Sequence, residues 1–578
     1  MSSMRMNLKR SAWRGFTGAG AIGFCLWMTG CATTGPQSNP REARVDQLFQ
    51  AWNRPDSPGA AVVVVKDGAV VFQRGYGCAN LEQGIPITPQ TRFDVASVAK
   101  QFTGLSVAML VEQGQLSLDD DVRKHLPDVP DFGQPITLAH LLYHTSGLRD
   151  WPESFLLSNL DFEAPITFEM ILELVRRQRE LDFAPGEQMQ YSNTGYNLLA
   201  AVVAKVTGQS FRAWMDTKVF QALGMKHTHV CDNPAEIVPN RAESYSISTP
   251  PGTPRRVTSQ LSGLGSSSLF ISAEDMGKWL LNFETAQVGG KAAIAIICRP
   301  GSLKNGAKSV SCSGLFENDY HGHRVLEHSG SWAGYRSFTR VIPEKRLAVA
   351  VLANAANLNP QQQAIKLTDL FLDDPDTAKS RSQSPESGVA VKSDPSTWDA
   401  FPGTYRLGAG WLLTITREAD TLMTQATNED RFKMTPAGIN TFTVEGYNHQ
   451  KVEFVRQKSG AVTNLVYRGI NAPKLDLPKI APADLAAYAG DYWSEELRVA
   501  RRIEIHDGKL ATRDRSGQWL HFVPTGVDRF DADFGRWALQ FTRDGSSAVA
   551  EMKISGGRVR HLRYTRTTRP QVNLPGLK

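Results

Sequence analysis

The stretch FDVASVAKQFTG, residues 93–104, has the pattern of the start of a buried helix, yet it carries a lysine among apolar residues. Burying an ammonium group is costly unless the group is paired or loses its proton. Ser97 lies three residues before Lys100, so in a helix the hydroxyl and the amine share one face. The pair is therefore a candidate for a nucleophilic serine beside an amine that accepts its proton.

The Ser-x-x-Lys spacing is weak evidence by itself, because about one or two such pairs are expected by chance in a chain of this composition. Ser97 with Lys100 is the only one in the sequence. Taken alone, the pair is better explained by a helix-capping serine and a lysine whose stem is buried and whose head reaches solvent.

Two further motifs favour a catalytic role for Ser97 and Lys100 over the structural explanation. Tyr191-Ser192-Asn193 is the only Tyr-x-Asn in the chain and stands just before a predicted helix. A phenol beside a Ser-Lys pair can pass the proton to a leaving group, and an amide can hydrogen-bond a substrate carbonyl. His328-Ser329-Gly330 opens a predicted strand, where small residues let a substrate backbone lie along a sheet edge. A second His-x-Gly begins at His506, so this last motif proves little alone.

The order of predicted elements is strands, then many helices, then strands. Residues 59–77, GAAVVVVKDGAVVFQRGYG, are two apolar β-branched runs around Asp67-Gly68, which is typical of a hairpin. Helical patterns follow, bounded by cap residues such as Thr137, Gly208 and Ser272. Strands return at residues 335–354. This order predicts an α+β domain with one antiparallel sheet, whose first and last strands come from opposite ends of the sequence around an inserted helical region.

The C-terminal part repeats itself. Residues 373–397 are charged and rich in Ser and Pro, a composition typical of a linker. Beyond them FPGTY (401–405) matches YAGDY (488–492), and FVRQKSGAVTNL (454–465) matches FTRDGSSAVAEM (541–552), at an offset of 87 residues. Short alternating runs with Gly predict two small antiparallel, lipocalin-like β-barrels over 398–470 and 481–568.

With these motifs in this order, residues 45–372 resemble the penicillin-recognising serine hydrolases related to class C β-lactamases, D,D-peptidases, D-aminopeptidases and some esterases. The stretches LLYHTSGL (141–148) and GSSSLFISAEDMGKW (265–279) add to the resemblance. It implies a β-lactamase-like fold and an acyl-enzyme on Ser97, with Lys100 and Tyr191 sharing the duties of general base and general acid.

The resemblance also assigns residues around the nucleophile. It implies that Asn193, His328 and Gly330 contact the substrate and that the amides of Ser97 and Ser331 form the oxyanion hole. Three residues are implied to support the wall of the site, namely Tyr143, His144 and Ser146. In D-aminopeptidases a loop from a barrel can reach and restrict the active site, but the sequence does not indicate which residues would do so here.

His328 departs from the β-lactamase form of the third motif. In β-lactamases a lysine opens this triplet and helps to hold a substrate carboxylate, whereas a histidine is largely neutral at pH 7. A histidine at this place resembles the peptidase and D-aminopeptidase branches of the family, and this resemblance implies that the substrate is a small peptide or amide containing a D-amino acid. Carboxylic ester hydrolysis and weak β-lactam hydrolysis remain alternatives within the same family.

A rival of another class is a catalytically idle envelope lipoprotein that binds or scaffolds through its barrels. Deletion of residues 398–578 would separate the two, because an enzyme should keep Ser97 acylation if the truncated domain folds. No metal or organic cofactor is expected. The pairs His227 with His229 and His321 with His323 lack carboxylates arranged around them, and Trp332 fits an acyl pocket or the core equally well.

The N-terminus has the form of an export signal. Residues 1–30 carry four basic residues and no acid, followed by a short apolar run ending in MTGC. This resembles a lipoprotein box, so we expect the signal to be cleaved before Cys31, Cys31 to be lipidated, and residues 31–44 to form a short tether. The protein is then expected in the cell envelope, on the periplasmic side of a bacterial membrane. We expect that membrane to be the outer one.

The full sequence has a formal net charge of +6, and cleavage of the signal would remove four positive charges and leave +2. With no basic stripe, nucleic acid is not an expected partner, and oligomeric state is open. Apart from the lipidated Cys31, four cysteines remain in the mature chain: Cys78, Cys231, Cys298 and Cys312. Cys298 and Cys312 could bridge the loop between them, but four cysteines allow three pairings, and spacing does not choose among them.

Overall fold

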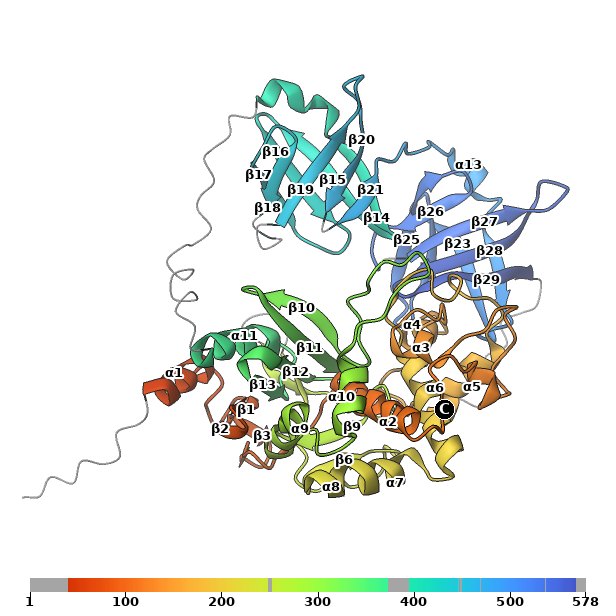
Figure 1. Ribbon diagram of the computed structural model, residues 1–578. Coiled ribbons are helices and arrows are strands. Elements are labelled where there is room, and N and C mark those ends of the chain that lie inside the picture. Colours follow the sequence, from red (N-terminus) through yellow and green to blue (C-terminus); the bar gives the residue numbers. More distant parts are fainter. Residues whose placement is uncertain are drawn as a thin grey trace, which may run out of the picture.

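The computed structural model describes residues 40–247, 252–372, 394–444, 446, 450–467, 469–535 and 537–567 (Figure 1). The predicted signal peptide, Cys31 and positions 373–393 of the predicted linker lie outside the described residues. Within the described ranges, no helix has both the length and the apolar character needed to span a membrane.

The N-terminal domain, residues 40–372, is built on one antiparallel sheet with the strand order β10-β11-β12-β13-β1-β2. β1 pairs with β13 along its whole length, from Ala60 opposite Ala353 to Lys66 opposite Leu347. The predicted sheet, closed by strands from opposite ends of the domain, is thereby confirmed. The strands are β1 (Ala60–Lys66), β2 (Ala69–Tyr76), β10 (Phe316–Tyr320), β11 (His323–Trp332), β12 (Tyr335–Ile342) and β13 (Leu347–Ala353).

The β1–β2 hairpin turns where its sequence predicts. Asp67 and Gly68 have φ angles of 50° and 81°, the left-handed values that a two-residue turn between twisted strands requires. β1 is buried on both faces, which explains its continuous apolar run of Ala and Val rather than an alternating pattern.

Helices cover the two faces of this sheet. One apolar core joins it to α2, α6 and α9, and a second joins its other face to α1 and α11. Predicted caps are present: Thr137 and Ser272 accept hydrogen bonds at helix starts, and Gly208 ends α6 with a left-handed φ. The helices are α1 (Pro40–Phe49), α2 (Lys100–Glu112), α3 (Leu138–Leu142), α4 (Trp151–Leu157), α5 (Phe168–Arg177), α6 (Asn193–Thr207), α7 (Phe211–Met215), α8 (Gln221–Leu223), α9 (Ala273–Thr285), α10 (Gly290–Cys298) and α11 (Pro360–Phe371).

Small sheets connect the helices. One sheet has three strands, in the order β5 (Arg92–Asp94), β9 (Leu269–Ser272) and β6 (Thr228–Val230). Two further sheets have two strands each: β3 (Cys78–Asn80) pairs with β4 (Ile85–Pro86), and β7 (Tyr245–Ile247) pairs with β8 (Pro254–Arg256). β5 leads directly into the turn that carries Ser97.

The structure corrects one prediction from the sequence and answers one question that the sequence left open. Helix α1 begins at Pro40, inside the tether expected over 31–44, because Val45 and Phe49 bury one face of the helix and Asp46 pairs with Arg74 of β2. Cys298 and Cys312 form no bridge: all four cysteines among the described residues are free thiols, and the Cys312 thiol faces the Cys298 carbonyl.

The repeat in the sequence is a repeat in the fold. The first unit is an eight-stranded antiparallel sheet preceded by a short 3-10 turn (Pro395–Ala400), and the second is a closed eight-stranded barrel preceded by α13 (Pro482–Leu485). β14 and β22 begin 87 residues apart, at Gly403 and Gly490. The two predicted barrels are thus confirmed, although β21 carries the first one beyond residue 470, to Pro473.

The strands of the first barrel are β14 (Gly403–Gly408), β15 (Trp411–Glu418), β16 (Thr421–Ala426), β17 (Arg431–Pro436), β18 (Thr441–Val444), β19 (Gln450–Arg456), β20 (Val462–Tyr467) and β21 (Ile470–Pro473). Those of the second are β22 (Gly490–Ser494), β23 (Val499–His506), β24 (Lys509–Arg513), β25 (Trp519–Gly526), β26 (Arg529–Ala532), β27 (Trp537–Arg543), β28 (Val549–Gly556) and β29 (Val559–Thr567).

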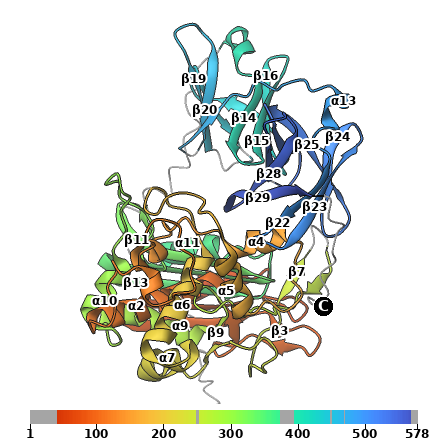
Figure 2. The same ribbon diagram turned by 90° about the vertical axis from the view of Figure 1, so that its right-hand side faces the viewer.

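The second barrel lies against the N-terminal domain. Figures 1 and 2 both show it beside α4, with the first barrel farther from that domain. A single apolar cluster contains Trp151, Phe155 and Ile171 of the N-terminal domain together with the interior of the second barrel. At its edge the buried Arg149 donates two hydrogen bonds to Glu496, at 2.8 and 2.9 Å. The second barrel and the N-terminal domain therefore share a core.

Candidate active site

Ser97 lies in a 3-10 turn, Ala96–Ala99, that runs directly into α2. The helix expected from residue 97 thus has a tighter first turn than an α-helix. Ala96 has a φ of 46°, which costs a non-glycine residue about 1 kcal/mol. Its amide donates to the buried Asp94 carboxylate at 2.8 Å, which holds this turn in place. Ser97 is left half-buried at the rim of a pocket, and Lys100 is fully buried behind it.

Lys100 has three oxygen neighbours. Its Nζ lies 3.1 Å from Ser97 Oγ, and 2.8 Å from both Asn193 Oδ1 and the Ser266 carbonyl oxygen. Burial holds the pKa of Lys100 well below its ordinary value, so the neutral amine becomes accessible. A neutral amine has two N–H bonds and one lone pair. Because the two carbonyl oxygens only accept, they take both N–H groups and leave the lone pair facing the Ser97 hydroxyl.

Tyr191 also lies beside Ser97. Its phenol is hydrogen-bonded to Ser97, and burial raises its pKa, so the group stays protonated. The Lys100 Nζ is 4.9 Å from the centre of the Tyr191 ring. Behind the ring, the buried His144 accepts a hydrogen bond on Nδ1 from the Ser192 amide at 3.1 Å. His144 thus fixes the loop that carries Tyr191, in keeping with the wall-supporting role expected for it.

Asn193 is held from both ends. Its Nδ2 donates to Asp150 Oδ2 at 3.0 Å and its backbone amide to Asp150 Oδ1 at 2.6 Å, while its side-chain oxygen accepts from Lys100. A carboxylate accepts only, so the amide orientation is fixed by its partners. The sequence indicated a substrate-orienting amide, and the structure adds that Asn193 joins Lys100 to a buried carboxylate.

His328 begins the part of β11 that faces the pocket. β10 pairs with β11 only as far as Glu327, so the edge from His328 to Trp332 is not covered by β10. The His328 Nδ1 donates to the Ser329 carbonyl at 2.6 Å, and burial lowers its pKa to about 3. His328 is therefore neutral at pH 7, as its sequence predicts. Ser331, the expected second oxyanion residue, lines the same pocket as Ser97.

Gly330 has a different role from the one predicted. A Cβ at this position would lie 2.1 Å from the Val95 carbonyl oxygen and 2.2 Å from the Ser337 hydroxyl. The residue is buried and does not line the pocket. Its missing side chain lets β11 approach the turn that carries Ser97, rather than making room for substrate.

These residues surround one pocket of about 430 Å³. It is lined by Ala96, Ser97, Trp151, Pro152, Tyr191, Asn193, Leu261, Ser267, Phe316, His328, Ser329, Ser331, Trp332 and Arg558. Five of them, Trp151, Tyr191, Leu261, Phe316 and Trp332, are aromatic or large apolar side chains, and Trp332 contacts Trp151 with ring centres 5.7 Å apart. The structure thus brings together Ser97, Asn193, Tyr191, His328 and Ser331, and places Lys100 just beneath them.

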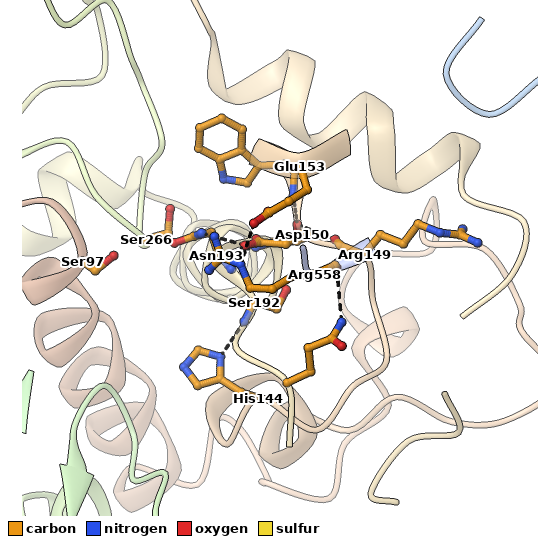
Figure 3. Close-up of polar contacts among 12 residues, drawn as sticks. Ser97, His144, Arg149, Asp150, Glu153, Ser192, Asn193, Ser266 and Arg558 are labelled. Atoms are coloured by element: carbon orange, nitrogen blue, oxygen red, sulfur yellow. Dashed lines mark hydrogen bonds and ion pairs between the residues drawn. The ribbon is translucent and has the colours of Figure 1, made fainter. Parts of the chain in front are cut away.

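The sequence did not reveal three polar residues of this site. Asp150 follows the recognised 141–148 stretch by two positions and was not singled out. Glu153 and Arg558 lie beside it, as Figure 3 shows, with Ser97 to one side of the cluster. Arg558 comes from the second barrel, 405 residues after Glu153, and no local pattern connects the two.

The histidine pairs considered as metal ligands are apart from the pocket. His229 contacts Glu236 and His323 contacts Glu344. Over the described ranges, the side chains close enough together to share a metal ion are His506, Asp507 and His521, on the second barrel.

The fold and the site define a serine hydrolase, and comparisons with known proteins agree. The Beta-lactamase family matches residues 45–372. A D-aminopeptidase from Gluconobacter oxydans is 26% identical over 541 residues, which cover 88% of this chain and 96% of that protein. A penicillin-binding protein from Bacillus subtilis is 24% identical over 447 residues, covering 74% and 96%.

Among solved structures, the octameric penicillin-binding protein homologue from Pyrococcus abyssi matches with a TM-score of 0.52 and 24% identity, over 75% of this chain and 99% of that one. This likeness shows the fold. Because the family match spans more than half of the sequence, the chain belongs to the beta-lactamase family.

Proposed function

We propose that the protein hydrolyses small D-amino-acid-containing peptides or amides through an acyl-enzyme on Ser97. The observation that carries this proposal is the arrangement of Lys100, whose two N–H acceptors are fixed and whose lone pair is left for the Ser97 proton. Ser97 Oγ would attack the substrate carbonyl as its proton moves to Lys100, and the protonated pair of Lys100 and Tyr191 would return a proton to the leaving amine. Water would then hydrolyse the ester.

The substrate class is supported by the charges of the pocket. His328 is neutral where a cation would be needed to hold a free carboxylate, and Arg558, the cation that lines the pocket, is paired with Asp150 and Glu153. The uncovered edge of β11 offers backbone groups to an extended peptide or amide. Similarity to a D-aminopeptidase also covers 88% of this chain, which is more than the N-terminal domain alone.

A fluorophosphonate probe and a substrate panel test the proposal. The probe should label the wild-type protein, and Ser97→Ala should abolish labelling. Among D-alanine p-nitroanilide, its L-enantiomer, a D,D-dipeptide, a p-nitrophenyl ester and a chromogenic cephalosporin, we expect the D-anilide to exceed the L-anilide in kcat/KM by roughly tenfold or more.

Each of the other outcomes would contradict a stated part of the proposal. Labelling that survives Ser97→Ala would disprove the nucleophile. Equal rates on both enantiomers would disprove the D-specificity, and turnover of the ester alone would identify an esterase. A folded wild-type protein that takes no probe would favour the idle scaffold.

We also propose that Cys31 carries a lipid that anchors the protein to the periplasmic side of the cell envelope. The support is the sequence of residues 1–31. Cys31→Ser should move the protein from the membrane fraction to the soluble fraction and abolish incorporation of a labelled fatty acid. Unchanged fractionation of the variant would contradict the anchor.

A further inference from the structure

The turn between β28 and β29 of the second barrel enters the active site of the N-terminal domain. Gly557 in this turn has a φ of 55°, and a Cβ there would lie 2.7 Å from the Cγ of Glu153. Glycine thus lets the turn lie directly against α4. The next residue, Arg558, accepts hydrogen bonds on its carbonyl from the Asp150 amide at 3.5 Å and from Gln190 Nε2 at 3.2 Å.

The Arg558 side chain contacts two carboxylates of the N-terminal domain. Its Nη1 lies 3.0 Å from Asp150 Oδ2, and its Nε donates to Glu153 Oε1 at 2.9 Å. The guanidinium carbon is 5.2 Å from the centre of the Tyr191 ring. Figure 3 shows Arg558, Asp150, Glu153 and Asn193 meeting at one point.

Asp150 connects this arginine to the catalytic lysine. Its side chain is fully buried, and its two oxygens accept both hydrogen bonds from Asn193, while Oδ2 also faces Arg558. The Asn193 oxygen in turn accepts from Lys100 at 2.8 Å. A continuous series of polar contacts therefore runs from Arg558 through Asp150 and Asn193 to Lys100.

We propose that Arg558 is a positioning residue of the active site: by pairing with Asp150, it keeps that carboxylate from holding Lys100 in the ammonium form. The second barrel thereby completes the catalytic centre of the N-terminal domain. This inference rests on the proposed function, because it concerns the proton acceptor of Ser97.

The charges around Lys100 support this role. Burial lowers the pKa of Lys100, the nearby Asp150 charge raises it, and the positive charge of Arg558 lowers it again. Loss of Arg558 would leave the carboxylate unopposed, which favours the ammonium. The other groups facing Lys100 stay neutral near pH 7, because burial lowers the pKa of both histidines and raises that of both tyrosines; they are His144, His328, Tyr191 and Tyr196.

Glu153, on the other side of Arg558, is the remaining group that titrates nearby, since burial raises its pKa to about 7. Its contribution is separated from that of Asp150 by the variants below.

The test is the pH dependence of Ser97 labelling by a fluorophosphonate in the full-length protein. In a plot of labelling rate against pH, Arg558→Gln should shift the rising part of the curve, the limb, to higher pH by about one unit. Labelling should be about tenfold slower at pH 7 and near the wild-type rate at high pH. Arg558→Lys, which keeps the charge, should retain the wild-type limb. Arg560→Gln, two residues farther along in β29, is the matched control, because its side chain contacts the exposed Gln188 instead.

A second variant keeps the test decisive if Arg558→Gln does not fold. Arg558→Gln combined with Asp150→Asn leaves no unopposed buried carboxylate, so its limb should return to within about half a pH unit of the wild type. A Glu153→Gln variant should leave the limb in place. The inference is overturned if Arg558→Gln lowers the rate equally at every pH, or if the double variant keeps a shifted limb. Absence of wild-type labelling would instead overturn the proposed function.

Discussion

Lys100 shows at the residue scale how a charge that is costly to bury acquires a chemical role. In the sequence it is an ammonium group without a partner, and in the structure it has three oxygen neighbours and a depressed pKa. The Ser97 spacing was visible in the sequence, since one turn of helix sets it. The acceptors that direct the lone pair come from α6 and from the loop before β9, so their convergence depends on the tertiary fold.

His328 gives a prediction about stability and pH. Its pKa is about 3 in the folded protein, against an ordinary value of 6.5. Between these values the unfolded chain binds a proton that the folded protein does not, so stability falls as pH falls below 6.5. At pH 5 the contribution amounts to about 2 kcal/mol. Urea unfolding at pH 7 and pH 5 should therefore show that the free energy of unfolding falls less between these two pH values in His328→Asn than in the wild type.

The exposed His321 provides the control for that measurement. His321→Asn should keep the wild-type pH dependence, because the side chain is exposed and asparagine tolerates the φ of 53° at this position. An identical loss in both variants would contradict the buried neutral state of His328.

At the scale of helices and strands, local sequence patterns predicted the turns, helix caps and repeats, because these features depend on residues close together in the sequence. The Asp67-Gly68 turn, the caps at Thr137 and Ser272, and the repeat of 87 residues in the barrels all appear as expected. The repeat extends to a buried tyrosine in each barrel: Tyr405 donates to the carbonyl four residues earlier at 2.6 Å, and Tyr492 does so at 2.7 Å. Arg558 could not be predicted, because its partners Asp150 and Glu153 lie in another domain and carry no matching motif.

Gly330 gives a prediction for the contact between β11 and the turn that carries Ser97. Gly330→Ala places a Cβ against the Val95 carbonyl, so β11 must move away from Ser97. We expect a loss of about 1–3 kcal/mol in the free energy of unfolding, together with a loss of Ser97 labelling in the fraction that folds. Gly526→Ala is the control, since its nearest atom is 3.6 Å away. Full labelling of Gly330→Ala would show that the spacing of the two elements is not critical.

At the scale of the whole molecule, the two barrels are not equivalent despite their shared fold. The second barrel shares a core with α4 and α5, supplies Glu496 to the buried Arg149, and places Arg558 in the pocket. The first barrel contacts the second, where Arg406 pairs with Asp531 at 2.7 Å. The barrels therefore differ in their relation to the active site, which their similar sequences do not indicate.

Two deletions separate these roles. Removal of residues 398–578, the deletion proposed from the sequence on the condition that the truncated domain folds, exposes Trp151, Phe155 and Ile171 and takes Glu496 away from Arg149. Arg149 keeps its contact with Asp182 at 3.3 Å, but the large apolar side chains of the shared core would face water, so we expect this truncated protein to aggregate or to lose Ser97 labelling.

Removal of the first barrel alone, residues 398–474, leaves every one of these contacts in place, so the protein should remain folded and labelled. Size-exclusion chromatography and probe labelling of both deletions provide the measurement. A monomeric, fully labelled product of the longer deletion would show that the N-terminal domain is self-sufficient. It would also contradict the role assigned to Arg558, because a site that labels normally without the second barrel does not need the arginine that this barrel supplies.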